Sequence, residues 1–358
     1  MKIVQTPVRF YPYVGGVENY VYELSKELIK LDNEVLVLCA NEGQPKDESD
    51  VDGIKVKGIQ YSFKIANTNI MPRLPFTLRK VDFDLMHTHL PTPYSADVSA
   101  LISKFKEKPA VLTYHNEIVA EGLNRVFSGV YNRFILPLLL RNVEAIVVTT
   151  DRYKEKLASK CPFCEDKISV IPVGVDVKRF KPIENRMEKN RKRLLFLSVL
   201  DDYHRYKGLD HLLEAVKGMD VELTVGGSGD LLEEYRKKAG KNVVFLGHVK
   251  EEEKVKLYND CDIFVLPSTS GLQEGFGMVA LEALSCGVPV IISNVGGIAD
   301  KVKKHGCGTV VEPGNVEELR KAIKNFDPEK GRNARKCALE HSWKRVAYEM
   351  SRLYESLV

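Results

Sequence analysis

Short apolar runs alternate with amphipathic helical stretches along the whole chain, and this alternation restricts it to folds built on parallel sheets. In the first half, the predicted strands are Ile3–Thr6, Glu34–Cys39, Leu85–Thr88, Ala110–Tyr114, Ala145–Thr149 and Ser169–Val173. In the second half, they are Leu194–Val199, Glu222–Val225, Val243–Leu246, Ile263–Pro267, Val288–Ser293 and Gly308–Val311. Each set is large enough for a doubly wound sheet, so we expect an α/β chain with two such domains.

A charged stretch separates the two sets of strands. Residues 176–193 contain Pro182 and show no apolar periodicity, which is typical of a linker. A length of 358 residues also suits two domains of common size. We therefore predict an N-terminal Rossmann-like domain at residues 1–180 and a C-terminal one at 181–358. The final amphipathic helix, about residues 341–358, could pack back on the first domain, since its composition favours neither.

Charge and hydropathy exclude some classes of function. The formal net charge is +4, from 53 basic and 49 acidic side chains, and this near balance gives no support for a nucleic-acid partner. The N-terminal residues lack the long apolar stretch of a signal peptide, and no run of 18 or more apolar residues occurs. We therefore expect a cytoplasmic chain that is soluble or peripheral to a membrane.

The cysteines do not form an evident framework. Their number, seven, is odd, which argues against a secreted disulfide-bonded protein. Cys161 and Cys164 form the only C-x-x-C pair, and no second ligand pair at zinc spacing accompanies them. A structural role for this pair is favoured over a local disulfide or a redox role.

The densest chemical signal lies in residues 267–290. A predicted strand ends at Pro267, a small polar loop follows, and Gly275 to Gly277 open a helix. The first amides of a helix lack partners and carry the positive end of the dipole, so they suit a diphosphate. Glu274 precedes the helix and Glu282 follows after seven residues, and both carboxylates can accept hydrogen bonds from vicinal hydroxyls. A capped helix with two solvated acids explains the same pattern equally well.

Residues 274–291 resemble the Glu-(seven residues)-Glu motif of the retaining glycosyltransferases of family 4, also described as glycosyl transferases group 1. The similarity continues through most of the chain. It implies the GT-B fold, in which two Rossmann-like domains face each other across a cleft. It also implies that Glu282 binds the ribose of a nucleotide-sugar donor and that Glu274 contacts the transferred sugar. The main-chain amides of Phe276, Gly277 and Met278 would then lie near the sugar and the diphosphate.

The first domain carries two further matches. Gly15 and Gly16 follow the first predicted strand and open a helix, where paired glycines let the backbone approach a phosphate or a sugar. An ordinary turn is the alternative. His115 ends a predicted strand, and the resemblance implies that it contacts the transferred sugar. His87 and His89 could suggest a metal pair, but a structural or acceptor-side role is favoured because the family carries a similar pair without metal.

The second domain carries a cation and glycine-rich turns. Lys207 and Gly208 precede a predicted helix, and a lysine there can neutralise a leaving diphosphate in place of a metal, as the resemblance implies. Residues 226–229, with Gly227, resemble the turn that faces the donor. Residues 245–249, ending at Val249, match the segment whose main chain meets the nucleobase. Gly296 and Gly297 match another turn, for which a plain loop is as good an interpretation.

One position departs from the family. An arginine is usual shortly before the Lys-Gly pair, but Asp201 and Asp202 stand near that place. An acid beside a diphosphate would repel it, so these side chains should point away or bind something else. Arg205 is the nearest guanidinium, and we predict that it takes over the phosphate role. The alternative is a solvated Arg205 paired with Asp201 or Asp202.

Other motifs are weak. Asp82-Phe-Asp84 and Asp260-Cys-Asp262 have the Asp-x-Asp form used by metal-dependent glycosyltransferases of the other major fold, but each leads into an apolar strand. No metal or other cofactor is therefore expected. No G-x-G-x-x-G follows the first strand with an acid about twenty residues later, so a dinucleotide oxidoreductase is poorly supported.

The sequence therefore predicts a retaining, metal-independent hexosyltransferase. The donor would be a nucleotide diphosphate sugar, with a UDP-sugar favoured and GDP-mannose next, and the acceptor a hydroxyl of a sugar, a lipid-linked sugar or a small alcohol. The alternatives are another GT-B activity, such as an epimerase or a phosphorylase, and a non-catalytic nucleotide-sugar binder. Two stretches that mix basic and apolar residues, 64–80 and 125–141, suggest peripheral membrane contact, although ordinary core helices would look the same.

Overall fold

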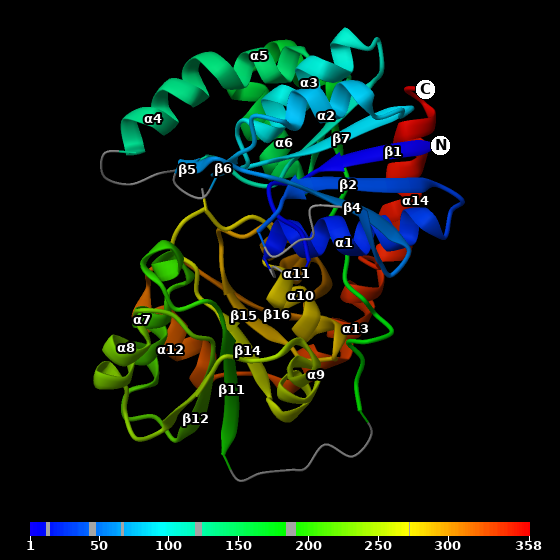
Figure 1. Cartoon of the computed structure of the whole chain (residues 1–358). Helices are drawn as coiled ribbons and strands as arrows, with labels where there is room; N and C mark the ends of the chain where they lie inside the picture. Colours follow the sequence, from blue (N-terminus) through cyan, green and yellow to red (C-terminus); the bar gives the residue numbers. More distant parts are fainter. Residues whose placement is uncertain (12–14, 43–47, 66–67, 119–123, 184–190, 272) are drawn as a thin grey trace. The chain divides into compact units, whose positions relative to one another are not determined.

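The computed structural model describes residues 1–11, 15–42, 48–65, 68–118, 124–183, 191–271 and 273–358. The chain divides into two compact units, each with its own parallel sheet (Figure 1). The first unit comprises Met1–Gly174 together with Trp343–Val358, and the second comprises Val175–Ser342. Among the described residues, no helix combines the length and the apolar character needed to cross a bilayer.

The first unit is built on an eight-stranded sheet in the order β10-β9-β8-β7-β1-β2-β4-β3. All strands are parallel to their neighbours except β3. The six strands predicted in this half of the sequence are all present. The strands of the sheet are β1 (Lys2–Thr6), β2 (Glu34–Ala40), β3 (Glu48–Val51), β4 (Ile54–Ile59), β7 (Leu85–Leu90), β8 (Ala110–Tyr114), β9 (Ala145–Val148) and β10 (Ile168–Val170).

The sequence prediction missed four strands of this unit. β3 and β4 form an antiparallel hairpin, and β4 extends the main sheet by pairing with β2. The hairpin turns at Asp52 and Gly53, whose φ angles are 52° and 83°. Positive φ at both central residues is typical of a type I′ turn, and Asp-Gly is its usual sequence signal. A separate two-stranded ribbon contains β5 (Phe63–Ile65) and β6 (Thr68–Ile70).

Helices cover both faces of this sheet. α1 packs against α14, and α3 contacts β7 and β8 as well as the neighbouring helices α2 and α5 (Figure 1). The last helix is therefore part of the first unit. Its Trp343 ring fills the space beside Gly174, where an added Cβ would lie 2.4 Å from a ring carbon. The helices of the unit are α1 (Gly16–Ile29), α2 (Leu74–Lys80), α3 (Ser95–Phe105), α4 (Asn124–Val130), α5 (Leu136–Arg141), α6 (Asp151–Lys160) and α14 (Trp343–Glu355), with a π-helical turn at Tyr131–Ile135.

The second unit contains a six-stranded parallel sheet in the order β13-β12-β11-β14-β15-β16. All six strands predicted for this half are present, as β11 (Lys192–Leu197), β12 (Val221–Gly226), β13 (Val243–Gly247), β14 (Ile263–Leu266), β15 (Val290–Ser293) and β16 (Gly308–Val311). The helices are α7 (Leu209–Val216), α8 (Leu232–Lys238), α9 (Glu251–Asp260), α10 (Met278–Ser285), α11 (Ala299–His305), α12 (Val316–Lys324) and α13 (Gly331–Leu339). α7 packs against α12, and α10 packs against α13.

The stretch predicted as a linker is partly built into the second unit. Phe180 is buried, and its ring lies 5.8 Å from that of Tyr258. Arg335 donates hydrogen bonds to the main-chain oxygens of Phe180 and Val177. Residues 184–190 lie outside the described part of the chain, and the stretch ends within β11. The polar composition of residues 176–193 gave no sign of these contacts, because the buried packing comes from a single aromatic ring, that of Phe180.

Strand order reverses once in each sheet. In the first unit, β1 lies between β2 and β7, and in the second, β11 lies between β12 and β14. The loops that follow the two central strands on either side of such a switch leave in opposite directions and open a crevice. In the second unit these loops carry Lys207 and Glu274. In the first unit, the loop after β1 carries Gly15, and the second loop begins where β7 ends, next to His89.

Candidate functional site

Glu274 and Lys207 form an ion pair at the switch point of the second unit. The Lys207 Nζ lies 3.0 and 2.8 Å from the two carboxylate oxygens of Glu274. Ser268 donates its hydroxyl to the same carboxylate at 2.5 Å. The Glu274 residue is 3% exposed and the Lys207 side chain 16%, so the pair is largely shielded from water. A lysine and a carboxylate that far apart in sequence meet only because β11 and β14 are neighbours.

Backbone packing brings these two loops together. Gly208 has φ 79°, and a Cβ there would lie 2.1 Å from the main-chain oxygen of Pro267. The Thr269 amide donates to the main-chain oxygen of Tyr206 at 2.7 Å. Only glycine permits this approach at position 208, so the residue after Lys207 fixes the lysine against the end of β14.

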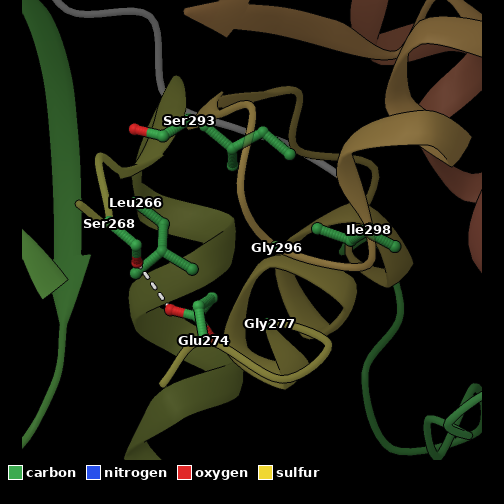
Figure 2. A pocket seen from close by; sticks show the side chains of 8 residues that line it. Leu266, Ser268, Glu274, Gly277, Ser293, Gly296 and Ile298 are labelled. Carbon is green, nitrogen blue, oxygen red and sulfur yellow. Dashed lines mark hydrogen bonds between the residues drawn. The ribbon is translucent and has the colours of Figure 1, made fainter. Parts of the chain in front are cut away.

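A small pocket opens beside Glu274. Figure 2 shows Glu274 directed toward Ser268, with the start of α10 and the turn at Gly296 next to it. A Cβ at Gly296 would lie 3.2 Å from the Glu274 side chain, so this glycine leaves room for the carboxylate. The residues lining the pocket are Leu266, Ser268, Glu274, Gly277, Ile292, Ser293, Gly296 and Ile298.

The start of α10 forms one side of this region. Gly277 is the N-cap residue, with φ 90°, a conformation that favours glycine. The buried Phe276 ring lies 5.4 Å from that of His341, which fixes the turn before the helix. The main-chain amides of residues 276–278 belong to the turn and first residue of the helix, where amides have no helical partner. This geometry can bind an anion without any acidic or basic side chain of its own.

Glu282 occupies a separate place on α10. Tyr258 donates its hydroxyl to the Glu282 Oε2 at 2.7 Å, and the Lys254 Nζ lies 3.9 Å from the same atom. Burial raises the pKa of Glu282, and the Lys254 ammonium and the Tyr258 hydroxyl act against that shift. The carboxylate is therefore oriented by a tyrosine on α9 and is not a solvated surface acid.

Two further turns of the second unit are shaped by glycine. Gly227 has φ 141°, and a Cβ there would lie 1.7 Å from the main-chain oxygen of Ser198. Its amide donates to the main-chain oxygen of Gly247 at 2.7 Å, which ties the turn after β12 to the end of β13. Val249 lies close to Gly226, where an added Cβ would be 2.7 Å from a valine methyl group. The predicted donor-side turn is thus a close backbone junction.

Arg205 lies in an acidic network. Its guanidinium contacts Asp202 at 2.7 Å, Glu234 at 2.9 Å and Asp210 at 3.9 Å. Glu234 most strongly, and then Asp202, raises the pKa of Arg205. Asp201 binds something else, as the sequence argument required, because it accepts hydrogen bonds from the amide and the ring of His204. Arg205 therefore contacts Glu234 on α8. Of the two basic residues, Arg205 and Lys207, it is Lys207 that contacts Glu274.

The predicted residues of the first unit are Gly15, Gly16 and His115. His115 follows β8, and its Nε2 lies 3.4 Å from the Nδ1 of His89 at the end of β7. Gly15 is the N-cap residue of α1 in an extended conformation. A Cβ on Gly16 would meet no atom within 4 Å, so a side chain would fit there and the glycine leaves the backbone open. Residues 12–14, which precede this pair, lie outside the described residues.

The histidines and aspartates that were considered as metal ligands, and disfavoured, have partners within the protein. His87 contacts Thr113 and Tyr354, and His89 contacts Gln5. Asp82 pairs with Lys2 at 2.7 Å, and Asp262 pairs with Arg193 at 2.8 Å. Within the described residues, no three His, Cys, Asp or Glu side chains are grouped as a metal site would require.

Cys161 and Cys164 are free, buried thiols. The Cys164 Sγ donates to the main-chain oxygen of Cys161 at 2.9 Å. Burial raises the pKa of Cys161, and it raises that of Cys164 to about 11. Thiols with raised pKa are poor nucleophiles, so this pair contributes packing in the structure.

Sequence reasoning missed the residues that hold the acids in place. Ser268 could have been found, because it directly follows the strand that ends at Pro267. Tyr258 and Lys254 gave no signal, because α9 reads as an ordinary amphipathic helix. Gln5 and Tyr354 come from opposite ends of the chain and meet the histidines only through the tertiary fold.

Both halves of the chain match families of glycosyltransferases. Residues 14–179 match the family described as Glycosyltransferase Family 4, and residues 178–338 match Glycosyl transferases group 1. The chain is 30% identical to the D-rhamnosyltransferase WbpZ of Pseudomonas aeruginosa, over 87% of this chain and 82% of that protein. It is 28% identical to the phosphatidyl-myo-inositol mannosyltransferase of Mycolicibacterium smegmatis, over 96% and 90% of the two chains.

Solved structures share the fold over the full length. Anabaena HepE in complex with UDP and glucose has a TM-score of 0.80 at 20% identity and covers 100% of both chains. WaaG, a glycosyltransferase involved in lipopolysaccharide biosynthesis, has a TM-score of 0.72 at 18% identity, over 98% of this chain and 99% of that one. These likenesses confirm the predicted GT-B architecture.

Proposed function

The chain belongs to the glycosyltransferases of family 4 and group 1, which act with a nucleotide-sugar donor, and from this premise we propose that it transfers a hexosyl group to a hydroxyl acceptor with retention of anomeric configuration. The observation that carries the proposal is the shielded Lys207–Glu274 pair beside the start of α10. This arrangement offers a cation and free amides to a diphosphate, and a buried carboxylate to sugar hydroxyls.

The residues take separate roles in this proposal. The amides of residues 276–278 and the Lys207 ammonium bind the diphosphate, and Glu274 accepts hydrogen bonds from the transferred sugar. Glu282, which Tyr258 orients, accepts hydrogen bonds from the ribose hydroxyls. When the diphosphate binds, Lys207 exchanges its contact with Glu274 for one with the phosphate that later leaves. That exchange neutralises charge where it develops, which is the largest contribution that such sites make to catalysis.

The chemical step needs little covalent help from the protein. The bond between the anomeric carbon and the diphosphate oxygen breaks, and an oxocarbenium-like centre forms. The acceptor hydroxyl attacks the same face, and its proton passes to the departing phosphate oxygen. The products are the glycoside and the nucleoside diphosphate. The protein holds the reactants in place and stabilises the charge, and no metal is required for either task.

A UDP-sugar is the favoured donor and GDP-mannose the second. The UDP-glucose complex of HepE supports the first, and the mannosyltransferases among the sequence relatives support the second. The nucleobase would meet the main chain near β13, so side chains there do not decide between bases. A thermal-shift series with UDP-, GDP- and ADP-sugars tests the assignment, because a bound donor raises the apparent melting temperature. No shift with any of them would contradict the donor-binding proposal.

Product analysis separates transfer from the other activities open to this fold. The transferase should release the nucleoside diphosphate and place the hexose on the acceptor. An epimerase would instead change the sugar of the donor, a phosphorylase would need inorganic phosphate, and a binder would leave the donor intact. Mass spectrometry of the reaction mixture, with and without a glycosyl acceptor, distinguishes these outcomes.

We also propose that the first unit contacts an anionic membrane surface. Exposed apolar side chains recur every four residues along α4, the π-helical turn and α5, at Val126, Val130, Phe134 and Leu138. Residues 124–141 contain three arginines and no acid. α3 contacts both α5 and α2, and the exposed apolar side chains continue on α3 with Leu101 and Phe105 and on α2 with Phe76. We call these seven apolar side chains the outer helix surface. Apolar side chains with interspersed arginines suit the interface of an anionic bilayer.

A further inference from the structure

A series of hydrogen bonds runs through the first unit and ends at His115. Ser25 on α1 donates its hydroxyl to the main-chain oxygen of Val21 at 2.6 Å. The Gln5 side-chain amide on β1 donates to the Ser25 Oγ at 2.8 Å. The Gln5 Oε1 lies 3.0 Å from the His89 Nε2, and the His89 Nδ1 lies 3.4 Å from the His115 Nε2. Gln5, Ser25 and His89 are fully buried, so water does not compete for these contacts.

The direction of each hydrogen bond follows from the first one. Ser25 has one hydroxyl hydrogen, and it is used on Val21, so its oxygen can only accept from Gln5. The amide nitrogen of Gln5 therefore faces Ser25, and its carbonyl oxygen faces His89. An amide oxygen can only accept, so His89 must carry its hydrogen on Nε2.

The same reasoning continues to His115. Burial lowers the pKa of His89 well below its usual range and lowers that of His115 to about 3, so both rings are neutral near pH 7. A neutral His89 protonated on Nε2 has a lone pair on Nδ1, and His115 must then donate to it through its own Nε2 hydrogen. The remaining nitrogen of His115, Nδ1, is left with a lone pair.

Neighbouring rings hold this arrangement in place. The His89 and His115 rings are nearly parallel, at 22°, with centroids 5.6 Å apart. The Tyr20 ring meets His115 edge-on at 4.7 Å and also packs against Trp343. His87 stands outside the series, because its two nitrogens contact Thr113 and Tyr354. His115 itself is only partly buried.

We propose that Ser25 and Gln5 are positioning residues that fix the tautomer of His115, so that the ring accepts a hydrogen bond from a hydroxyl of the transferred hexose. The site would then select a ligand group that can donate, such as a hydroxyl, over one that can only accept, such as a carbonyl or an ether oxygen. The contact with the hexose rests on the proposed function. The tautomer does not, since it follows from the protein's own hydrogen bonds.

The series has one alternative state, which makes the proposal testable. If Ser25 donated to the Gln5 oxygen, every later bond would reverse, and His115 would carry its hydrogen on Nδ1. Nitrogen-15 NMR of the full-length protein labelled at histidine distinguishes the two tautomers by the shifts of their ring nitrogens. The His115 signals are those lost in His115→Gln. We expect the Nε2-protonated form alone in the wild type.

Substitutions then test the control by Ser25 and Gln5. Ser25→Ala and Gln5→Leu should each convert His115 to a mixture of tautomers. Ser99→Ala is the matched control, because Ser99 is also buried in this unit, where it donates to Thr6 at 2.9 Å. It should leave the His115 signals unchanged. A wild-type His115 protonated on Nδ1, or an unchanged tautomer in both Ser25→Ala and Gln5→Leu, would overturn the proposal.

A second measurement concerns the ligand. With UDP-glucose as the probe, Ser25→Ala should lower turnover about fivefold to tenfold, as expected when one hydrogen bond to a neutral group is weakened. Ser99→Ala should not. If the NMR result holds but UDP-glucose is not turned over by the wild type, the assigned donor is wrong and the tautomer assignment stands. If turnover is normal in Ser25→Ala despite a mixed tautomer, His115 does not accept from the hexose.

Discussion

Lys207 Nζ lies 2.8 Å from Glu274 Oε2, and the two residues are held by loops that follow neighbouring strands of one sheet. The pair keeps each charge compensated in a place with little access to water. A negatively charged diphosphate would compete with Glu274 for the lysine, which then frees the carboxylate for hydroxyl groups. The ion pair therefore links binding of the diphosphate to the availability of Glu274.

Glu274→Gln should lower turnover about a hundredfold to a thousandfold while leaving the fold intact, because the amide keeps the shape of the side chain but loses its charge. Steady-state kinetics with the best donor of the thermal-shift series measures the effect. Glu252→Gln is the control, since Glu252 is an exposed acid on α9 of the same unit. Wild-type turnover in Glu274→Gln would contradict the assigned contact with the sugar.

Lys207→Met should destabilise the second unit, because it removes the ammonium that lies 2.8 Å from the buried Glu274 carboxylate. The expected loss in the free energy of unfolding is about 1–3 kcal/mol. The double variant Lys207→Met with Glu274→Gln should recover part of that loss, since the buried side chain at position 274 then carries no charge. Urea denaturation measures all three variants.

The same variants separate stability from function. The double variant should stay inactive although its stability improves, because both proposed contacts with the donor are missing. Additive losses in the urea experiment would mean that the two side chains do not interact in solution. Donor affinity measured by calorimetry should fall in every variant that lacks Lys207.

Transfer activity should survive chelation. Lys207 and the start of α10 provide the positive charge that a cation supplies at the diphosphate in metal-dependent enzymes. Turnover is compared before and after dialysis against EDTA, with Mg²⁺ or Mn²⁺ added back to a third sample. Loss of activity on chelation together with recovery on adding the metal would refute the metal-independent proposal.

Arg205 offers a prediction in which two variants change in opposite directions. If it also binds the diphosphate, Arg205→Ala should weaken UDP binding, by about fivefold for an exposed ion pair. Glu234→Gln should strengthen it, because Glu234 holds the guanidinium at 2.9 Å and would release it. Isothermal titration with UDP measures both. Unchanged affinity in both variants would mean that Arg205 only ties its loop to α8 and that Lys207 carries the charge alone.

The sequence predicted much of this fold because its strands are short apolar runs between amphipathic helices. It failed at β3 and β4, where lysines and acids alternate with few apolar residues and only the Asp52-Gly53 turn marks a hairpin. It also treated residues 176–193 as a linker, since the anchoring contacts of Phe180 are made with residues far along the chain. Local patterns do not report contacts of that kind.

The site shows the same division. Glu274 and Lys207 stood out in the sequence because each follows a predicted strand, where the chemistry of parallel sheets concentrates, and Glu282 stood out because of its spacing from Glu274. Their partners were not, because Ser268, Tyr258 and Lys254 are defined by distance alone. Of the acidic partners of Arg205, only Asp202 could be anticipated from the sequence, because it lies three residues away. Glu234 lies on a helix 29 residues further on and could not have been paired with it from the sequence.

The outer helix surface gives the prediction that concerns the membrane. At low salt the protein should float with vesicles that contain phosphatidylglycerol and stay at the bottom with vesicles of phosphatidylcholine alone. Arg133 and Arg141 lie in the same stretch of sequence as Phe134 and Leu138, and a basic side chain near an anionic bilayer contributes about 1 kcal/mol to binding. Arg133→Gln with Arg141→Gln should therefore reduce flotation, and so should added salt, which screens exposed charges.

Phe134→Ser with Leu138→Ser tests the apolar part of the same surface. These side chains are 65% and 55% exposed, so their loss should reduce flotation without unfolding the protein. Tyr348→Ser is the matched control. Tyr348 is 56% exposed and belongs to the same unit, but it lies on α14, which is distant in sequence from α4 and α5. A second copy of the chain is the other possible occupant of this surface. Light scattering should then be compared for the wild type and for Phe134→Ser with Leu138→Ser. A wild-type dimer, a monomeric variant and no flotation of either protein would show that this surface mediates self-association and would contradict the membrane proposal.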